Sequence, residues 1–192
     1  ELCSLTLQKH DLSLANLISN GLFGDGAAAV VLVGARRARS LELGGPLAGP
    51  TVRATRSSFY PDTEEVMGWQ ISERGFEVVL SKSVPTVARE FLGRDVRAFL
   101  ADQGLANGAI HRWICHPGGP KVLEAMQESL GLEEADVALS WKVLAEQGNC
   151  SSASALMVLR EVFDGPQPAP GALGCLVAMG PGFCSEMVLV EW

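Results

Sequence analysis

The sequence predicts an α/β layered fold, because segments typical of strands alternate with segments typical of helices. The chain has 192 residues, of which 47% are hydrophobic, and this is enough for the core of about one domain. Charged residues make up only 19%, which suits a chain with much buried or partner-facing surface. No long Ser/Gly linker divides it, so residues 1–192 are treated as one unit.

The first third of the chain predicts strands, a short helix and glycine-rich turns. Residues 27–33 combine small and β-branched side chains, which suits a buried strand. In chain order we expect a strand over 2–7, a short helix over 12–18, a glycine-rich turn over 20–26, the strand 27–33, an irregular Pro/Gly segment over 43–50, a strand over 51–59 and a polar loop over 61–68.

From Pro85 onwards the pattern is mainly helical, with three interleaved strands. Pro85 and Pro120 suit the first turn of a helix, and Gly131 suits a helix end. In chain order we expect a helix ending near 104, a short buried strand over 112–115, a helix over 120–131, a helix over 141–146, a helix over 153–163 capped by Ser151 or Ser152, a Pro/Gly loop over 165–171, and strands over 173–179 and 187–190.

Composition argues against several function classes. The net charge of −7 gives no sign of the basic surface that nucleic-acid-binding proteins have, so a nucleic-acid partner is not expected. The apolar stretches 27–35 and 172–179 are too short to span a bilayer. The 5 cysteines are scattered without a CxxC pair, which predicts a reduced, cytoplasmic protein and argues against a metal site. The chain begins at Glu1 in what reads as a strand already under way, so we expect it to be a piece of a longer polypeptide.

Two glycine-flanked polar residues are the strongest candidates for chemistry. His116 follows the expected strand 112–115 and precedes Pro-Gly-Gly-Pro, and Asn149 follows Gly148 at the entry to a helix. Glycine permits close approach of a backbone or a ligand. Two neutral donors on one carbonyl oxygen would stabilise an enolate or a tetrahedral oxyanion.

Each candidate also has an ordinary structural interpretation. His116 could simply bond the backbone at a strand end, and Asn149 could be a helix cap. Phe23, within Leu-Phe-Gly-Asp-Gly, could be a core residue or line a channel. The Gly180-Pro181-Gly182 turn could be a tight hairpin or backbone shaped around a ligand.

Four motifs in order resemble the type III polyketide synthases, the family of chalcone and stilbene synthases. They are GLFGDGAAA at 21–29, WICHPGGP at 113–120, GNCSSA at 148–153 and GPG at 180–182, and the ELCSL start resembles bacterial members. The resemblance covers essentially the whole chain. It implies a thiolase-like fold (αβαβα layers) built from two similar halves, of which this chain is the C-terminal half, and a homodimer. The third class of ketoacyl-carrier-protein synthases resembles it less, since those enzymes carry His-Gln-Ala-Asn where this chain has His-Pro-Gly-Gly.

The resemblance also implies a reaction. An acyl-CoA starter is loaded onto a cysteine, malonyl-CoA is decarboxylated, and the enolate attacks the acyl thioester before the product cyclises. An alkylpyrone is the candidate product. CoA thioesters are substrates, and no cofactor is expected. The nucleophilic cysteine lies upstream of this chain, in an N-terminal half that would be its partner, so the chain alone is expected to be inactive.

Site roles carry over residue by residue from the resemblance. His116 and Asn149 match the catalytic pair, and His116 would also hold the cysteine as a thiolate. The remaining matches are Phe23 as gatekeeper, Ser151, Trp69, Gly180, Pro181 and Gly182 around the cavity, and Gly118, Gly119 and Lys121 near CoA. The chain departs from the family at 178–182, where AMGPG stands in place of GFGPG.

Two alternatives remain open at this point. One is a non-catalytic truncated paralogue or a dimerisation partner, since half of such a fold would expose a large apolar face. The other is a carrier-protein-dependent ketoacyl synthase. An enzyme that uses carrier-protein thioesters would be a ketoacyl synthase, whereas one that uses CoA thioesters would be a type III polyketide synthase.

Overall fold

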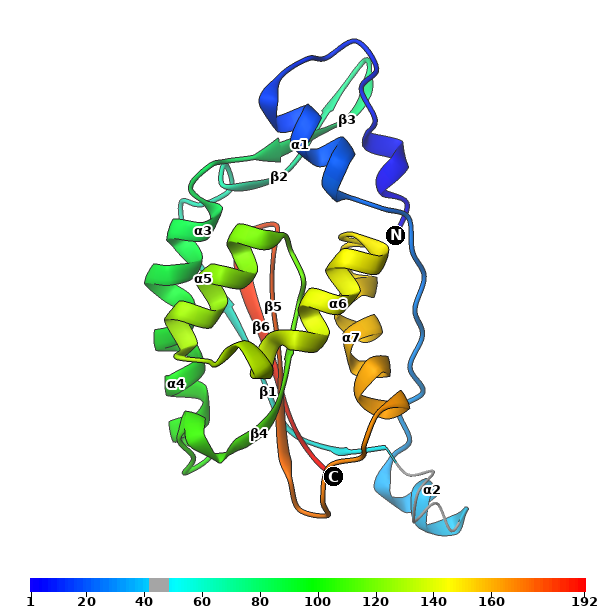
Figure 1. The fold of residues 1–192 in the computed structure, drawn as a ribbon, viewed down its shortest axis with the longest axis vertical. Coiled ribbons are helices and arrows are strands. Elements are labelled where there is room, and N and C mark those ends of the chain that lie inside the picture. Colours follow the sequence, from blue (N-terminus) through cyan, green and yellow to red (C-terminus); the bar gives the residue numbers. More distant parts are fainter. Residues whose placement is uncertain (42–48) are drawn as a thin grey trace.

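A computed structural model describes residues 1–41 and 49–192, and it shows a central sheet with helices on both faces (Figure 1). The strands are β1 (Thr51–Phe59), β2 (Met67–Ser72), β3 (Gly75–Leu80), β4 (Ile110–Cys115), β5 (Leu173–Gly180) and β6 (Cys184–Glu191). The helices are α1 (Leu14–Leu22), α2 (Ala35–Ser40), α3 (Val84–Val87), α4 (Gly93–Asp102), α5 (Pro120–Leu130), α6 (Ala138–Gln147) and α7 (Ser152–Asp164).

The central sheet is mixed, with strand order β1-β6-β5-β4. Strands β4 and β5 are parallel, whereas β5–β6 and β6–β1 are antiparallel. A parallel pair needs a long crossover, and here α5, α6 and α7 supply it. Parallel strands end at the same edge of the sheet, so the loop after β4 and the turn after β5 lie at one edge.

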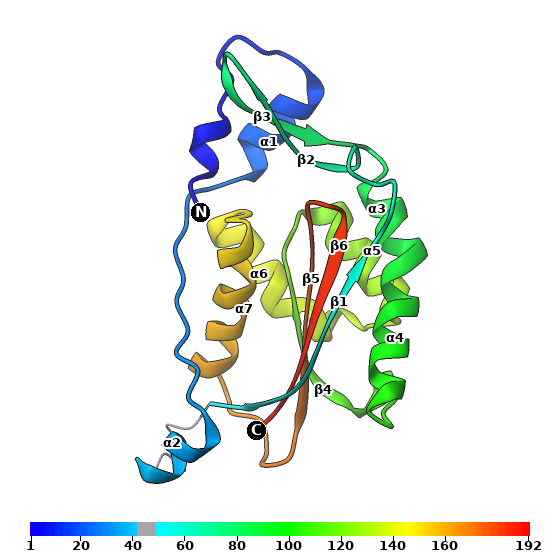
Figure 2. The same cartoon turned by 180° about the vertical axis from the view of Figure 1, so that it is seen from behind.

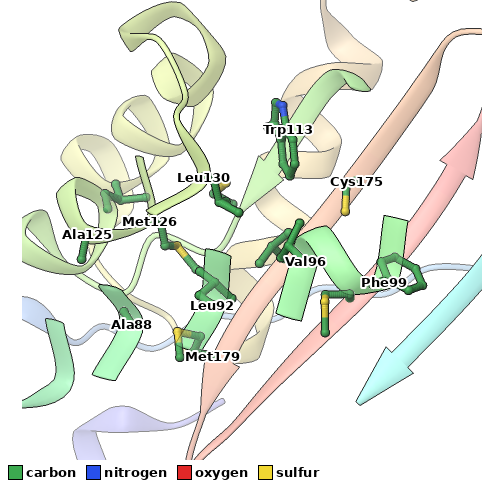
Figure 3. Packing of buried hydrophobic residues seen from close by; sticks show 14 of the residues in the cluster. Ala88, Leu92, Val96, Phe99, Trp113, Ala125, Met126, Leu130, Cys175 and Met179 are labelled. Carbon is green, nitrogen blue, oxygen red and sulfur yellow. The ribbon is translucent and has the colours of Figure 1, made fainter. Parts of the chain in front are cut away.

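Alternating side chains bury both faces of the sheet. Trp113, Cys115 and Val177 face a core shared with α4 and α5, shown in part in Figure 3. Ile114 and Leu176 face the opposite side and pack with α6 and α7. The period of two along a strand explains this division.

Local sequence explains the ends of α5. Pro120 begins the helix, and Gly131 ends it in the left-handed conformation, with φ 66° and ψ 42°. Leu123, Met126 and Leu130 lie on its buried face, as a helical period requires.

The structure confirms most of the expected elements beyond residue 50. These are the strand 51–59, the helix ending near 104, the strand 112–115, the helices over 120–131, 141–146 and 153–163, and the strands over 173–179 and 187–190. Ser151 is the residue before α7, but its side chain makes no capping bond. The hydroxyl of Ser154 instead accepts from the N–H of Cys150 at 2.7 Å.

Two expected strands near the N-terminus are wrong. Residues Cys3–Thr6 form a 3₁₀ turn, and Leu2 makes only an isolated bridge with Asp25. Residues 27–33 are extended but pair with no strand among the described residues, and Val31 is 86% exposed. A strand needs a continuous hydrogen-bonding neighbour. Residues 2–7 have only the single bridge from Leu2 to Asp25, and residues 27–33 have none in the described chain.

The expected turn 20–26 begins later than predicted. Ser13 caps α1 by accepting from the N–H of Asn16, and the helix continues through Gly21 to Leu22. The turn therefore starts at Phe23. Residues 43–48 of the expected irregular segment lie outside the described residues.

A hairpin of β2 and β3 was not predicted. It pairs Trp69 with Val78 and lies beside α1, away from the central sheet (Figures 1 and 2). The side chain of Gln8 joins it to the N-terminal segment by donating to the carbonyl oxygens of Arg74 and Phe76.

Candidate functional site

His116 lies at the carboxyl end of β4, and its backbone is bonded on both sides. Its N–H donates to the carbonyl oxygen of Val177 in β5 at 2.8 Å. Its carbonyl oxygen accepts from the N–H of Gly118 at 2.9 Å. The residue is buried, at 6% exposed, so the strand end delivers the imidazole into the interior.

Asn149 lies between α6 and α7, and its side-chain amide is fixed at both atoms. The Nδ2 group donates to the carbonyl oxygen of Gly118 at 3.1 Å, and Oδ1 accepts from the N–H of Ser151 at 2.8 Å. These partners assign which end of the amide is the donor. Since Nδ2 carries two hydrogens, one remains for a second acceptor.

A backbone bridge joins Phe23 to Asn149. The N–H of Asn149 donates to the carbonyl oxygen of Leu22 at 2.8 Å, and the N–H of Gly24 donates to the carbonyl oxygen of Asn149 at 3.0 Å. The segment after α1 thereby pairs with the segment before α7. Phe23 and Asn149, 126 positions apart in sequence, are direct neighbours in the structure.

Glycines allow three segments to meet here. A Cβ at Gly118 would lie 3.4 Å from Cδ2 of His116, and a Cβ at Gly119 would lie 3.2 Å from Cδ2 of Leu22. A Cβ at Gly148 would lie only 2.9 Å from the carbonyl oxygen of Leu22. Gly148 also has φ +70°, which side chains rarely adopt.

We expect Gly148→Ala to be considerably more destabilising than Gly104→Ala. Gly104 has φ +71° with open space around it, so its alanine pays about 1 kcal/mol for the left-handed backbone. The alanine at 148 also collides with the Leu22 carbonyl, which adds about 2 kcal/mol, and its backbone at φ 70° and ψ −163° lies in a region essentially restricted to glycine. Urea unfolding of the 192-residue chain measures the loss in free energy of unfolding for both variants. Equal losses for the two variants would contradict the close packing at Gly148.

Burial sets the charge of His116. Desolvation lowers the pKa of the imidazole to about 4, so the ring is neutral at pH 7. Its Nδ1 atom is buried and has no hydrogen-bond partner among the described residues. A neutral ring donates from one nitrogen only, which fits a donor to a carbonyl oxygen.

The same burial predicts a pH dependence of stability. In the unfolded chain His116 takes up a proton near pH 6.5, whereas in the folded chain it does so only near pH 4. The contribution of His116 to the free energy of unfolding is therefore fully present above pH 6.5. It is lost as the pH falls towards 4, and the total loss is about 3 kcal/mol. The free energy of unfolding of His116→Gln should fall less over this range. If the free energy of unfolding of the two chains falls equally with pH, His116 is not the source of the pH dependence.

The other residues assigned by resemblance fall into three groups. Ser151, Gly118 and Gly119 lie beside the His116–Asn149 pair through the contacts above. Trp69 lies in β2 and is 44% exposed, and Lys121 is exposed in the first turn of α5. Gly180 ends β5, and Pro181 and Gly182 lie in the turn that leads to β6, at the sheet edge where His116 lies. Their roles, like that of Phe23 as gatekeeper, stay predictions.

The cysteines next to the two donors are buried. Cys115 is fully buried and Cys150 is 2% exposed, as expected for small apolar residues. Desolvation raises the pKa of the Cys115 thiol to about 12, which opposes formation of a thiolate.

Leu22 is a site residue that sequence reasoning missed. Its carbonyl oxygen holds Asn149, and its side chain covers Gly119. Its only signal is its position next to Phe23 in a glycine-rich motif.

Residues 1–41 and 49–192 contain neither a membrane-spanning helix nor a cluster of metal-ligating side chains. No helix there is both long and apolar enough to cross a membrane. No group of three or more His, Cys, Asp or Glu side chains in these residues is placed to hold a metal ion.

Known proteins resemble this chain in sequence and in fold. The family model for chalcone and stilbene synthases, C-terminal domain, matches residues 51–191. A 1,3,6,8-tetrahydroxynaphthalene synthase from Streptomyces peucetius subsp. caesius is 53% identical over 193 residues, covering 100% of this chain and 49% of that protein. An alpha-pyrone synthesis polyketide synthase-like protein from Mycobacterium tuberculosis H37Rv is 32% identical, covering 100% and 48%.

A solved structure shows the same fold. The crystal structure of the 1,3,6,8-tetrahydroxynaphthalene synthase from Streptomyces coelicolor A3(2) matches with a TM-score of 0.89 and 33% identity, covering 99% of this chain and 51% of that one. This match confirms the thiolase-like α/β fold that the sequence resemblance implies. The chain spans about half the length of the curated relatives it matches.

Proposed function

This chain belongs to the chalcone and stilbene synthase family, and from that membership we propose that it is the C-terminal half of a type III polyketide synthase. The reaction is iterative decarboxylative Claisen condensation with CoA thioesters as substrates. The nucleophilic cysteine is supplied by the preceding half of the same polypeptide, and the 192-residue chain alone is inactive. The homodimer implied by the resemblance is part of this proposal.

The proposed step uses His116 and Asn149 as two donors to one oxygen. When malonyl-CoA loses CO₂, the electron pair of the broken C–C bond passes to the thioester and forms an enolate. Donors fixed before the reaction stabilise that oxygen without reorganising. The enolate carbon then attacks the acyl thioester on the cysteine, forming a C–C bond as the cysteine leaves as a thiolate.

One observation carries this proposal. The amide of Asn149 donates to the carbonyl oxygen of Gly118, two residues after His116, so two donors from different parts of the chain are held at one place. The amide orientation leaves a second N–H available, and burial keeps the histidine neutral.

The test is decarboxylation of malonyl-CoA by the protein containing both halves. We expect acetyl-CoA and CO₂ from that protein and neither product from the 192-residue chain. A carrier-protein thioester used in place of the CoA thioester would indicate the ketoacyl synthase instead. Absence of turnover with any thioester would contradict the enzymatic proposal.

We propose a tetrahydroxynaphthalene as the product, formed from malonyl-CoA alone. The support is the 53% identity with a 1,3,6,8-tetrahydroxynaphthalene synthase. An alkylpyrone from an acyl-CoA starter is the second candidate, supported by 32% identity with an alpha-pyrone synthesis protein. Mass spectrometry of products made with malonyl-CoA, with and without a long-chain acyl-CoA, decides between them.

The exposed segment 27–33 supports association with the preceding half. Val31 and Leu32 are 86% and 77% exposed, and the segment runs apart from the sheet in both views (Figures 1 and 2). Residues 30–32 also line a groove of about 840 Å³ with side chains of α7 and of the central sheet, including Leu156, Phe163 and Val188. An apolar surface of this kind is typical of an interface.

We expect Val31→Asp to destabilise the two-half protein but not the 192-residue chain. In the shorter chain residue 31 faces solvent, so the change is neutral to within about 0.5 kcal/mol. In the longer protein the same carboxylate is buried without a partner, at a cost of about 3 kcal/mol. Denaturant unfolding of both lengths measures this difference. An equal effect in the two proteins would mean that the segment is no interface.

A further inference from the structure

We propose that Ser140 is a positioning residue that sets His116 against Asn149 by clamping α6 to the end of β4. This inference rests on the proposed function, because it concerns the same two donors. Ser140 lies in α6 and is completely buried. Its hydroxyl donates to the carbonyl oxygen of Cys115 at 2.7 Å, and Cys115 is the residue directly before His116.

The Ser140 hydroxyl forms its hydrogen bond with a neighbouring strand rather than within its own helix. A serine inside a helix commonly bonds back to a carbonyl in the preceding turn. Here it bonds instead to a residue 25 positions earlier, in a strand. Breaking this bond would loosen the link between α6 and β4, which also pack through Ile114 and Val143, without removing any contact that Ser140 makes within α6.

His116 depends on its backbone for its position. Its Nδ1 has no hydrogen-bond partner among the described residues, so no such bond at this nitrogen orients the ring. The position of the ring follows from the main chain, which is held by the Val177 and Gly118 bonds and, one residue earlier, by Ser140. A shift of this strand end moves the imidazole directly.

The same helix leads to Asn149. Helix α6 ends at Gln147, seven residues after Ser140, and Gly148 then delivers Asn149. Seven residues of helix span roughly 10 Å of nearly rigid rod. Ser140 therefore ties the strand that ends at one donor to the helix that leads to the other, and the Asn149–Gly118 bond closes the loop at the far end.

Ser185 offers a matched control. It is also completely buried, and its hydroxyl lies 2.8 Å from the hydroxyl of Tyr60. Ser185→Ala and Ser140→Ala each remove one buried hydroxyl and one hydrogen bond. Only Ser140 is bonded to the residue that precedes His116.

The experiment measures malonyl-CoA decarboxylation by the two-half protein. We expect Ser140→Ala to lower kcat at least about tenfold with KM unchanged, since small misplacements of catalytic groups are costly. Ser185→Ala should leave kcat within about twofold of wild type at a similar melting temperature. In a His116→Gln background, Ser140→Ala should cause no further loss beyond about twofold, because its effect runs through His116.

Three results would overturn the proposal: an unchanged kcat in Ser140→Ala, a loss matched by Ser185→Ala, or a full tenfold loss in the His116→Gln background. If Ser140→Ala does not fold, Ser140→Cys keeps the size of the side chain and a weaker donor, and it should show an intermediate kcat. Wild-type kcat in a folded Ser140→Cys protein would then count against the clamp.

A second readout separates this proposal from the proposed function. An NMR titration of His116 in the 192-residue chain needs neither turnover nor the cysteine of the preceding half, and a looser strand end should let water reach the ring. Ser140→Ala should then move the pKa of His116 upwards towards its ordinary value, whereas Ser185→Ala should not. If the wild type lacks decarboxylase activity, the function fails while this titration still decides the clamp.

Discussion

Replacing Asn149 with alanine should lower kcat for malonyl-CoA decarboxylation by about 10²–10³-fold in the two-half protein. The proposed amide donor to the developing enolate oxygen is lost. The bonds to Gly118 and Ser151 are lost as well, so the alanine variant alone mixes catalysis with structure.

The Asn149→Asp variant separates these effects. Its Oδ1 can still accept from the N–H of Ser151, but the donor becomes a carboxylate oxygen. A negative charge facing a developing enolate is repulsive, so the loss in kcat should equal or exceed that of alanine. Melting temperature and CoA binding provide the controls. More than a tenth of wild-type kcat in Asn149→Asp would exclude Asn149 as the oxyanion donor.

Replacing His116 with glutamine is the second large effect, with an expected fall in decarboxylation of about 10²-fold. Glutamine retains an amide donor but cannot carry a positive charge. The substitution therefore tests two roles at once: donation to the thioester oxygen and support of a cysteine thiolate.

The pH dependence of cysteine alkylation distinguishes the two roles. In this structure burial holds the pKa of His116 near 4, and an adjacent negative charge would raise it. We therefore expect the imidazolium to form only with the thiolate of the preceding half. Iodoacetamide should inactivate the wild type at lower pH than His116→Gln. Coincident profiles would show that His116 acts as a donor alone.

The sequence predicted the C-terminal part of the fold well because its signals are local. Pro120 and Gly131 mark both ends of α5, and residues 173–179 carry a buried strand whose partners lie in this chain. Residues 27–33 have the composition of a strand but find no neighbour in the described chain. The β2–β3 hairpin was missed because Glu73-Arg74 between its strands lacks the glycine or asparagine typical of tight hairpins.

The candidate site was predictable in its residues but not in its connections. His116 and Asn149 stand out through the glycines beside them and through their family motifs. Their link through the Gly118 carbonyl, and the clamp at Ser140, depend on how α6 packs against β4. No periodicity or spacing encodes such a contact, because it joins residues tens of positions apart.

Leu22 has a consequence for attempts to redesign this protein. Its carbonyl and side chain touch the segments at 148–149 and 119, so residues 22–24, 116–119 and 148–151 form one interlocked unit. In a chimera that exchanges only one of these segments with a homologue, the contacts between that segment and the other two would no longer match. An exchange of this site with a homologue should therefore move all three segments together, although they come from distant parts of the chain.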